Sequence, residues 1–141
     1  MFRHAITCFI LLLPLAISAV VTGARAQAAE LVMIEQQGCA YCIAWKRDIG
    51  PIYPKTDEGA FAPLRMIDID DGVPKDLTFA RKVVFTPTFI LIDNNTEVSR
   101  IEGYPGEDFF WGLLNMMLTS KTSFGSGATD SMGDNARSTN G

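Results

Sequence analysis

Two cysteines spaced Cys-x-x-Cys stand in the segment Glu35-Gln36-Gln37-Gly38-Cys39-Ala40-Tyr41-Cys42-Ile43-Ala44-Trp45. The apolar residues 31–34 before them predict a buried strand, and the residues after them follow a helical pattern. A cysteine at the start of a helix meets unpaired backbone N–H groups and the positive end of the helix dipole, which favour the thiolate. The sequence therefore predicts that Cys39 is the attacking sulfur and that Cys42, one turn later, resolves a mixed disulfide.

A structural disulfide and half of a zinc site are the alternatives for this pair. Zinc takes about four ligands, usually Cys and His, but the remaining cysteine is Cys8 and the single histidine is His4. A c-type haem would need a histidine after Cys42, where Ile43 stands. A purely structural bridge across so short a loop would restrict the unfolded chain little. We therefore expect a redox-active Cys39–Cys42 disulfide and no metal or organic cofactor.

Residues 1–26 have the pattern of a signal peptide. Arg3 precedes the apolar residues 5–21, and Ala24 and Ala26 supply the small side chains that signal peptidase requires. The alternative is an uncleaved membrane anchor, but the apolar stretch is shorter than the roughly 20 residues of a spanning helix. We expect cleavage and export to an oxidising compartment, which is the periplasm in a Gram-negative bacterium.

The charge of the chain is acidic. The 12 Lys and Arg against 16 Asp and Glu give a formal net charge of −4. Cleavage before Gln27 would remove Arg3 and Arg25 and leave a formal charge of −6. Because no basic surplus or patch is present, we expect no nucleic-acid partner.

The first half of the chain predicts two strands and one helix. Residues 30–36 form the first strand, residues 40–49 the helix, and residues 64–69 a second strand with alternating apolar positions. Trp45 falls on the inner face of the helix and is expected to anchor the core. Three acidic residues near the end of the second strand lack the spacing of a calcium loop and are expected to be solvated: Asp68, Asp70 and Asp71.

The second half predicts a short helix at residues 74–82, strands at 89–92 and 97–102 joined by a hairpin, and a last helix from Glu107. The strands that alternate with helices predict parallel pairing for the first three, and the hairpin adds an antiparallel fourth. Two stripes of the last helix are expected to face the core: Phe109, Leu113 and Met117, and Phe110, Leu114 and Leu118.

The domain organisation follows from these patterns. Residues 27–120 are expected to form one domain, since the chain is long enough for only one. Residues 121–141 are rich in Ser, Gly, Thr, Asp and Asn and are expected to be a disordered tail.

Three features resemble the thioredoxin superfamily: the Cys-x-x-Cys at a helix start, Thr86-Pro87-Thr88 before an apolar strand, and Gly103 after the hairpin. The resemblance implies a thioredoxin-like α/β fold with a central mixed four-stranded sheet flanked by helices. It also implies that Pro87 is a cis-proline beside the disulfide and that Thr86 presents its backbone to the substrate. An ordinary trans proline is the alternative.

The sequence departs from the usual thioredoxin pattern at two places. The redox motif is Gly-Cys-Ala-Tyr-Cys where thioredoxins have Trp-Cys-Gly-Pro-Cys, and Met33 stands where they carry a buried acid. A change of about 30 mV in potential corresponds to only about 1.4 kcal/mol, so the potential of thioredoxin cannot be transferred to this pair. Tyr41, inside the motif, is expected either to lie near the sulfurs or to shape the contact with a partner.

Two longer segments look like the SoxS-type periplasmic thioredoxins of bacterial sulfur-oxidation (Sox) gene clusters: Glu35-Gln36-Gln37-Gly38-Cys39-Ala40-Tyr41-Cys42 and Arg100-Ile101-Glu102-Gly103-Tyr104-Pro105-Gly106-Glu107-Asp108-Phe109-Phe110-Trp111. This resemblance implies a reductant that keeps the cysteine of the thiosulfate-carrying SoxYZ protein active. It also implies recharging by a membrane thiol-electron transporter of the CcdA/SoxV kind.

The first functional hypothesis is therefore a periplasmic thiol–disulfide oxidoreductase that acts as a reductase, with Cys39 and Cys42 catalytic and Thr86, Pro87 and Tyr41 binding substrate. A disulfide oxidase or isomerase is the second hypothesis. The third is a thioredoxin-fold regulatory or binding protein whose cysteines play no redox role.

Overall fold

The structure is a computed structural model, and it describes residues 29–126. The predicted signal peptide at residues 1–26 and residues 127–141 of the predicted tail lie outside the described residues. Within residues 29–126, no helix is both long and apolar enough to span a membrane.

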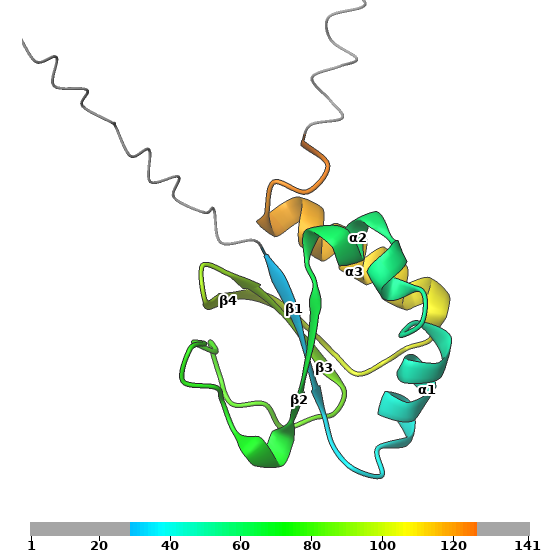
Figure 1. The fold of residues 1–141 in the computed structure, drawn as a ribbon, viewed down its shortest axis with the longest axis vertical. Helices are drawn as coiled ribbons and strands as arrows, with labels where there is room; N and C mark the ends of the chain where they lie inside the picture. Colours follow the sequence, from blue (N-terminus) through cyan, green and yellow to red (C-terminus); the bar gives the residue numbers. More distant parts are fainter. Residues whose placement is uncertain (1–28, 127–141) are drawn as a thin grey trace, which may run out of the picture.

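A mixed four-stranded sheet forms the centre of the molecule (Figure 1). The central strand β1 pairs in parallel with β2 and antiparallel with β3, and β3 pairs antiparallel with the outer strand β4. This arrangement confirms the predicted fold class. In the spatial order β2-β1-β3-β4, the strands are Leu64–Asp68, Glu30–Glu35, Thr88–Asp93 and Thr96–Glu102.

The predicted parallel pairing of the third strand was wrong. Asp68 at the end of β2 and Thr88 at the start of β3 both lie beside the last residues of β1, so the chain enters β3 from the end at which it left β2. A parallel strand would require a crossover that returns the chain to the opposite end of the sheet.

The predicted helix at residues 74–82 was also wrong, since these residues form turns and irregular structure. The backbone groups of Thr78 bond to the hairpin instead. Its N–H donates to Asn95 O at 2.8 Å, and its carbonyl accepts the N–H of Glu97 at 2.9 Å. A backbone committed to an isolated bridge with β4 cannot at the same time satisfy a helix.

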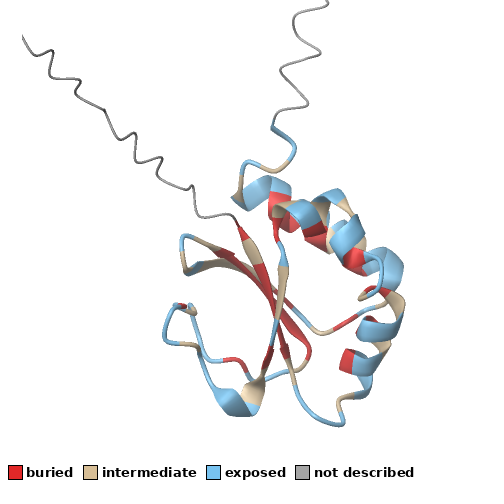
Figure 2. Ribbon diagram, in the orientation of Figure 1, coloured by how far each residue is buried: buried red, intermediate tan, exposed pale blue. Residues whose placement is uncertain are grey.

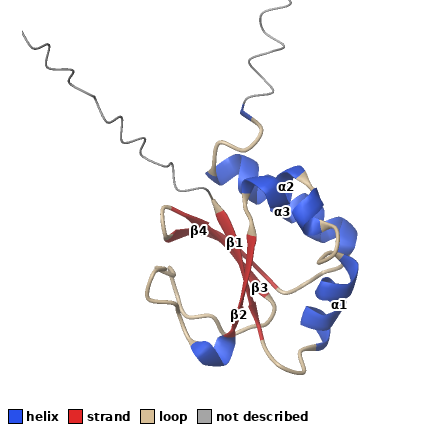
Figure 3. Ribbon diagram, in the orientation of Figure 1, coloured by secondary structure: helices blue, strands red, loops and turns tan. Residues whose placement is uncertain are grey.

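The helices gather on one side of the sheet, as Figures 1 and 3 show. They are α1 (Ala40–Asp48), α2 (Asp57–Phe61) and α3 (Glu107–Lys121), with a 3₁₀ turn, η1 (Tyr53–Lys55), before α2. A second 3₁₀ turn, η2 (Ile69–Asp71), follows β2.

The core between the sheet and the helices is built around aromatic rings. The Trp45 ring lies 5.2 Å from Phe89, 5.7 Å from Phe110 and 6.2 Å from Tyr53, measured between centroids. Trp45 is fully buried, as predicted. Figure 2 shows that buried residues are concentrated in the central strands β1 and β3 and recur on the helices.

One predicted core stripe of α3 was partly wrong. Phe110, Leu114 and Leu118 are fully buried, but Phe109 is 71% exposed. Successive residues on a helix are about 100° apart, so the helix cannot turn both stripes fully toward the sheet. Phe109 therefore lies on the solvent side.

Within residues 29–126, no α-helix covers the opposite face of the sheet. Its apolar residues Val32, Ile34 and Ile90 are covered by residues of the segment 72–87, which contributes Leu77 and Val83. We call this segment the covering loop.

Ordered contacts continue past the predicted domain end at residue 120. Helix α3 runs to Lys121, and the ring of Phe124 lies 5.2 Å from that of Phe61.

Candidate redox site

Cys39 and Cys42 are joined by a disulfide at the start of α1, with their Cα atoms 5.2 Å apart. A turn delivers the chain to this point, because the N–H of Cys39 donates to Gln36 O at 3.2 Å and Gly38 adopts a φ of +80°. Cys39 is the N-cap of α1, and its Sγ accepts the N–H of Cys42 at 3.1 Å. The start of α1 thus places a backbone N–H group that has no partner within the helix against the sulfur of Cys39. Such a group favours negative charge on that sulfur.

The two cysteines differ in burial. Cys42 is 1% exposed and belongs to the same apolar cluster as Met33 and Trp45. Cys39 is only partly buried and lies at the edge of that cluster. A partner approaching from solvent therefore meets the sulfur of Cys39 first.

The segment before β3 lies at the same end of the sheet as the disulfide. The Thr86–Pro87 peptide bond is cis. Pro87 is buried and Thr86 is partly exposed. The fully buried Thr88 donates its hydroxyl to Phe85 O at 2.7 Å, while the side chain of Phe85 remains 61% exposed.

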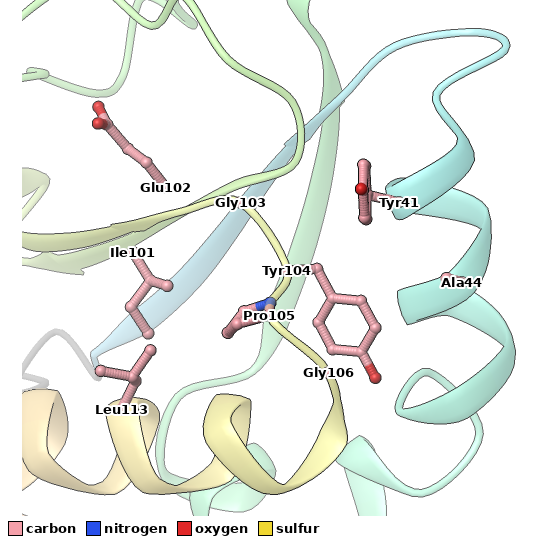
Figure 4. Close-up of a pocket in the computed structure, with 9 residues that line it drawn as sticks. All are labelled: Tyr41, Ala44, Ile101, Glu102, Gly103, Tyr104, Pro105, Gly106 and Leu113. Atoms are coloured by element: carbon pink, nitrogen blue, oxygen red, sulfur yellow. The ribbon is translucent and has the colours of Figure 1, made fainter.

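A groove of about 750 Å³ lies between α1, the loop after β4 and α3. Figure 4 shows Tyr41 and Ala44 on α1 facing the loop that carries Tyr104 and Pro105. Tyr41 is 64% exposed, so its ring stands at the open side of this groove. The lining is largely apolar.

We call residues 82–87, the last part of the covering loop, the proline loop, and a hydrogen bond joins it to the groove. The N–H of Gly103, a groove residue, donates to Pro87 O at 2.8 Å. Tyr41 and Gly103 line the groove, whereas Thr86 and Pro87 do not.

Tyr104 was not predicted from the sequence as a site residue. It is 8% exposed and lines the groove, and its hydroxyl donates to Asp48 Oδ2 at 3.3 Å. Gly103 (φ +87°) and Gly106 (φ +105°) enclose it, in a backbone region that favours glycine. The two glycines around Tyr104-Pro105 were the available sequence signal.

Charges near Tyr104 reinforce this contact. Burial raises the pKa of Tyr104, and the adjacent Asp48 carboxylate raises it further. The hydrogen bond from the Arg47 guanidinium holds the pKa of Asp48 below its ordinary value. At neutral pH a protonated tyrosine thus donates to an ionised carboxylate, which ties the loop after β4 to α1.

The structure shows the surroundings of Met33, one of the two places where the sequence departs from the usual thioredoxin pattern. Met33, where thioredoxins carry an acid, is fully buried. Close to the motif in sequence, Glu35 at the end of β1 forms an ion pair with Lys46 on α1.

No group of three potential metal-ligating side chains was found among residues 29–126. Asp68, at the end of β2, caps η2 by accepting the N–H of Asp70 at 2.9 Å.

Comparison with known proteins places this geometry in a family. No family model and no curated protein sequence matches the chain. Among solved structures, the periplasmic thioredoxin SoxS from Paracoccus pantotrophus, in its reduced form, is 49% identical, with 63% of this chain and 94% of SoxS covered and a TM-score of 0.62. A thioredoxin-fold protein from Helicobacter pylori is 19% identical, with 64% of this chain and 68% of that chain covered and a TM-score of 0.50, which supports the fold alone. With the Cys39–Cys42 pair at the start of α1, these similarities show that the chain belongs to the SoxS-type thioredoxins of the thioredoxin superfamily and is a thiol–disulfide oxidoreductase.

Proposed function

We propose that the protein is a periplasmic reductase that keeps the carrier cysteine of a SoxYZ-type sulfur-oxidation protein in its reduced, active form. The observation that carries this proposal is the 49% identity to SoxS over 94% of its length, together with the Cys39–Cys42 pair.

Cys39 is the proposed nucleophile. Its thiolate attacks one sulfur of a target disulfide, a Cys39–target mixed disulfide forms, and the other target sulfur leaves as a thiolate. Cys42 then loses its proton and attacks the Cys39 sulfur, which releases the second target thiolate and leaves the Cys39–Cys42 disulfide. Two electrons pass from the dithiol to the target. The burial of Cys42 and the partial exposure of Cys39 support this order of attack.

Thr86, Pro87 and Tyr41 are the proposed docking residues. The exposed side chains of Val84 and Phe85 provide apolar surface directly before Thr86. Tyr41 offers a ring on the other side, at the mouth of the groove. A target segment lying between these surfaces would pass over Cys39.

A dithiol in an oxidising compartment needs a source of electrons, and a membrane thiol-electron transporter of the CcdA/SoxV kind is the proposed donor. The proposed route to that compartment is removal of residues 1–26, with residues 27–120 as the exported domain. Intact-mass measurement of protein recovered from the periplasm tests this step, because cleavage would leave Gln27 as the first residue.

The deciding measurement is the reduction potential of the Cys39–Cys42 couple, obtained by equilibration with dithiothreitol or glutathione buffers followed by thiol alkylation. A potential near that of thioredoxin, about −270 mV, supports the reductase. A potential near about −120 mV, as in a strong periplasmic oxidant, rejects the reductase in favour of the oxidase. A pair that fails to cycle favours a binding protein without redox activity.

A trapping experiment identifies the partner. Cys42→Ser leaves the mixed disulfide on Cys39 unresolved, so the target stays covalently attached. Cys39→Ser is the matched control and should trap nothing. Recovery of a SoxYZ-type carrier supports the proposed role, and recovery only of unrelated disulfide proteins rejects it.

A further inference from the structure

A buried ion pair lies on the face of the sheet that the covering loop protects. Glu97 and Arg100 are both on β4, and each side chain is only 5% exposed. Arg100 stands opposite Ile90 of β3, whose side chain belongs to the apolar cluster under the covering loop. Arg100 Nε and Nη2 each donate to the Glu97 carboxylate at 2.6 Å.

This pair also holds the covering loop. The Glu97 carboxylate accepts the N–H of Ala80 at 2.8 Å. Arg100 Nη2 donates to the carbonyl of Arg81 at 3.0 Å. Two consecutive loop residues are therefore bonded to one rigid pair on the sheet.

The same strand holds the other end of the proline loop. The guanidinium of Arg81 donates to the Glu102 carboxylate at 2.8 Å, and Gly103 follows Glu102 in the chain and donates to Pro87 O. Residues 82–86 thus lie between two fixed contacts, that of Arg81 with Glu102 on β4 and that of Pro87 with Gly103 just after β4. The exposed side chains of Val84 and Phe85 lie in this span.

Stability alone does not explain such a pair. Taking two charges out of water costs about as much as their attraction returns, and apolar replacements of similar size are often neutral or stabilising. Within residues 29–126, Arg100 Nη1 is buried without a hydrogen-bond partner and lies 3.5 Å from the Glu102 carboxylate. The pair therefore fixes a position with little net gain in stability.

We propose that Glu97 and Arg100 are positioning residues, which set the place of residues 82–87 and thereby the docking of protein targets on Thr86 and Pro87. This inference rests on the proposed docking role of Thr86 and Pro87. The pair acts through the loop and leaves the chemistry of Cys39 and Cys42 unchanged.

The test variant is Glu97→Leu together with Arg100→Met. It removes both charges at once, so neither remains buried and unpaired, and it keeps similar side-chain volume. Ala80 and Arg81 are exposed residues, so we expect their freed backbone groups to bond to water in the variant. The matched control is Arg65→Met, which breaks the ion pair with Asp76 (2.8 Å) at the beginning of the same loop.

The measurement compares two disulfides. Protein reduced with dithiothreitol and desalted is mixed in single-turnover experiments with insulin, a protein disulfide, or with 5,5′-dithiobis(2-nitrobenzoate), a small one. We expect the double variant to lose on the order of tenfold in rate with insulin, because misplaced binding groups are costly. With the small disulfide we expect it to stay within about twofold of the unaltered protein, with an unchanged reduction potential, because a small target needs no docking surface. The control should match the unaltered protein with both.

Hydrogen exchange provides a readout that does not depend on activity. The N–H of Gly103 reports its bond to Pro87, and we expect it to exchange roughly tenfold faster in the double variant as local opening becomes easier. The inference is overturned if the insulin rate is unchanged, if both disulfides slow equally, if the control slows as much, or if Gly103 exchange is unchanged. If the unaltered protein reduces neither disulfide, the proposed function fails, and the Gly103 exchange then decides whether the pair positions the loop.

Discussion

The helices cover one face of the sheet with interlocking aromatic rings, whereas the covering loop protects the other face with a few aliphatic side chains and a buried ion pair. The helical face carries Cys42 and Trp45 on one rigid helix. The loop face carries the residues that lead to Pro87. The molecule thus places the reacting sulfurs on its densely packed face and the proposed docking segment on its sparsely packed face.

Neighbouring phenylalanines on α3 test the helical face most strongly. Phe110→Ala should lower the free energy of unfolding by about 3–5 kcal/mol, because it empties a site between Phe89 (4.8 Å) and Trp45 (5.7 Å). Phe109→Ala, one residue earlier and exposed, should change it by about 0.5 kcal/mol or less. Urea unfolding measures both, and equal losses would show that the helical face does not depend on this ring.

Two glycines, one in α2 and one in α3, test how closely the helical face is packed at each position. A Cβ at Gly59 would lie 1.9 Å from the carbonyl oxygen of Tyr53, so Gly59→Ala should cost about 1–3 kcal/mol through forced backbone movement. At Gly112, within α3, a Cβ meets nothing within 4 Å, and Gly112→Ala should stabilise the protein by about 0.5–1 kcal/mol. Thermal unfolding should therefore shift in opposite directions for the two variants. A gain of stability for Gly59→Ala would contradict the close approach.

The loop face should tolerate truncation better. Leu77→Ala should cost about 2 kcal/mol, at the low end for buried leucines, because the irregular loop can collapse into the space. Hydrogen exchange should then increase across residues 72–87 and remain unchanged in α1 and α3. A loss as large as that of Phe110→Ala, or a change spread over both faces, would remove the distinction between them.

Acid should weaken the loop face through Glu97, and this effect is the smallest. Burial tends to raise the pKa of Glu97, but hydrogen bonds from Arg100 and the N–H of Ala80 outweigh it and bring the pKa below the ordinary 4.5. Because the folded state lowers this pKa, the stabilisation is present above about pH 4.5 and is lost as the pH falls through the folded value. Unfolding free energies measured at several pH values should fall less steeply in Glu97→Leu/Arg100→Met than in the unaltered protein. Identical acid slopes would show that Glu97 contributes nothing to this dependence.

Local sequence patterns were enough to predict the main features of the helical face and the hairpin. The Cys-x-x-Cys helix, the role of Trp45 and the hairpin each follow from residues close together in sequence, where turn chemistry and helical spacing act directly. The hairpin turn, for example, uses Asn94 and Asn95, both with positive φ.

Such patterns could not predict the structure of the loop face, because contacts between residues far apart in the sequence determine it. The spacing of Leu77 suits a helix, yet Thr78 bonds to Asn95 and Glu97, which are far away in sequence. The same is true of the site residue Tyr104, whose partner Asp48 lies on another element. Pairing of Glu97 with the backbone of Ala80 leaves no local trace in the sequence.

The hydrogen bond from Gly103 to Pro87 has a practical consequence. It is a single amide that links the groove wall to the proline loop, the two surfaces between which we propose that a target lies. The ¹⁵N resonance of Gly103 is therefore a built-in reporter of occupancy: titration with a target peptide can be followed at one backbone signal, without attaching a label near the cysteines.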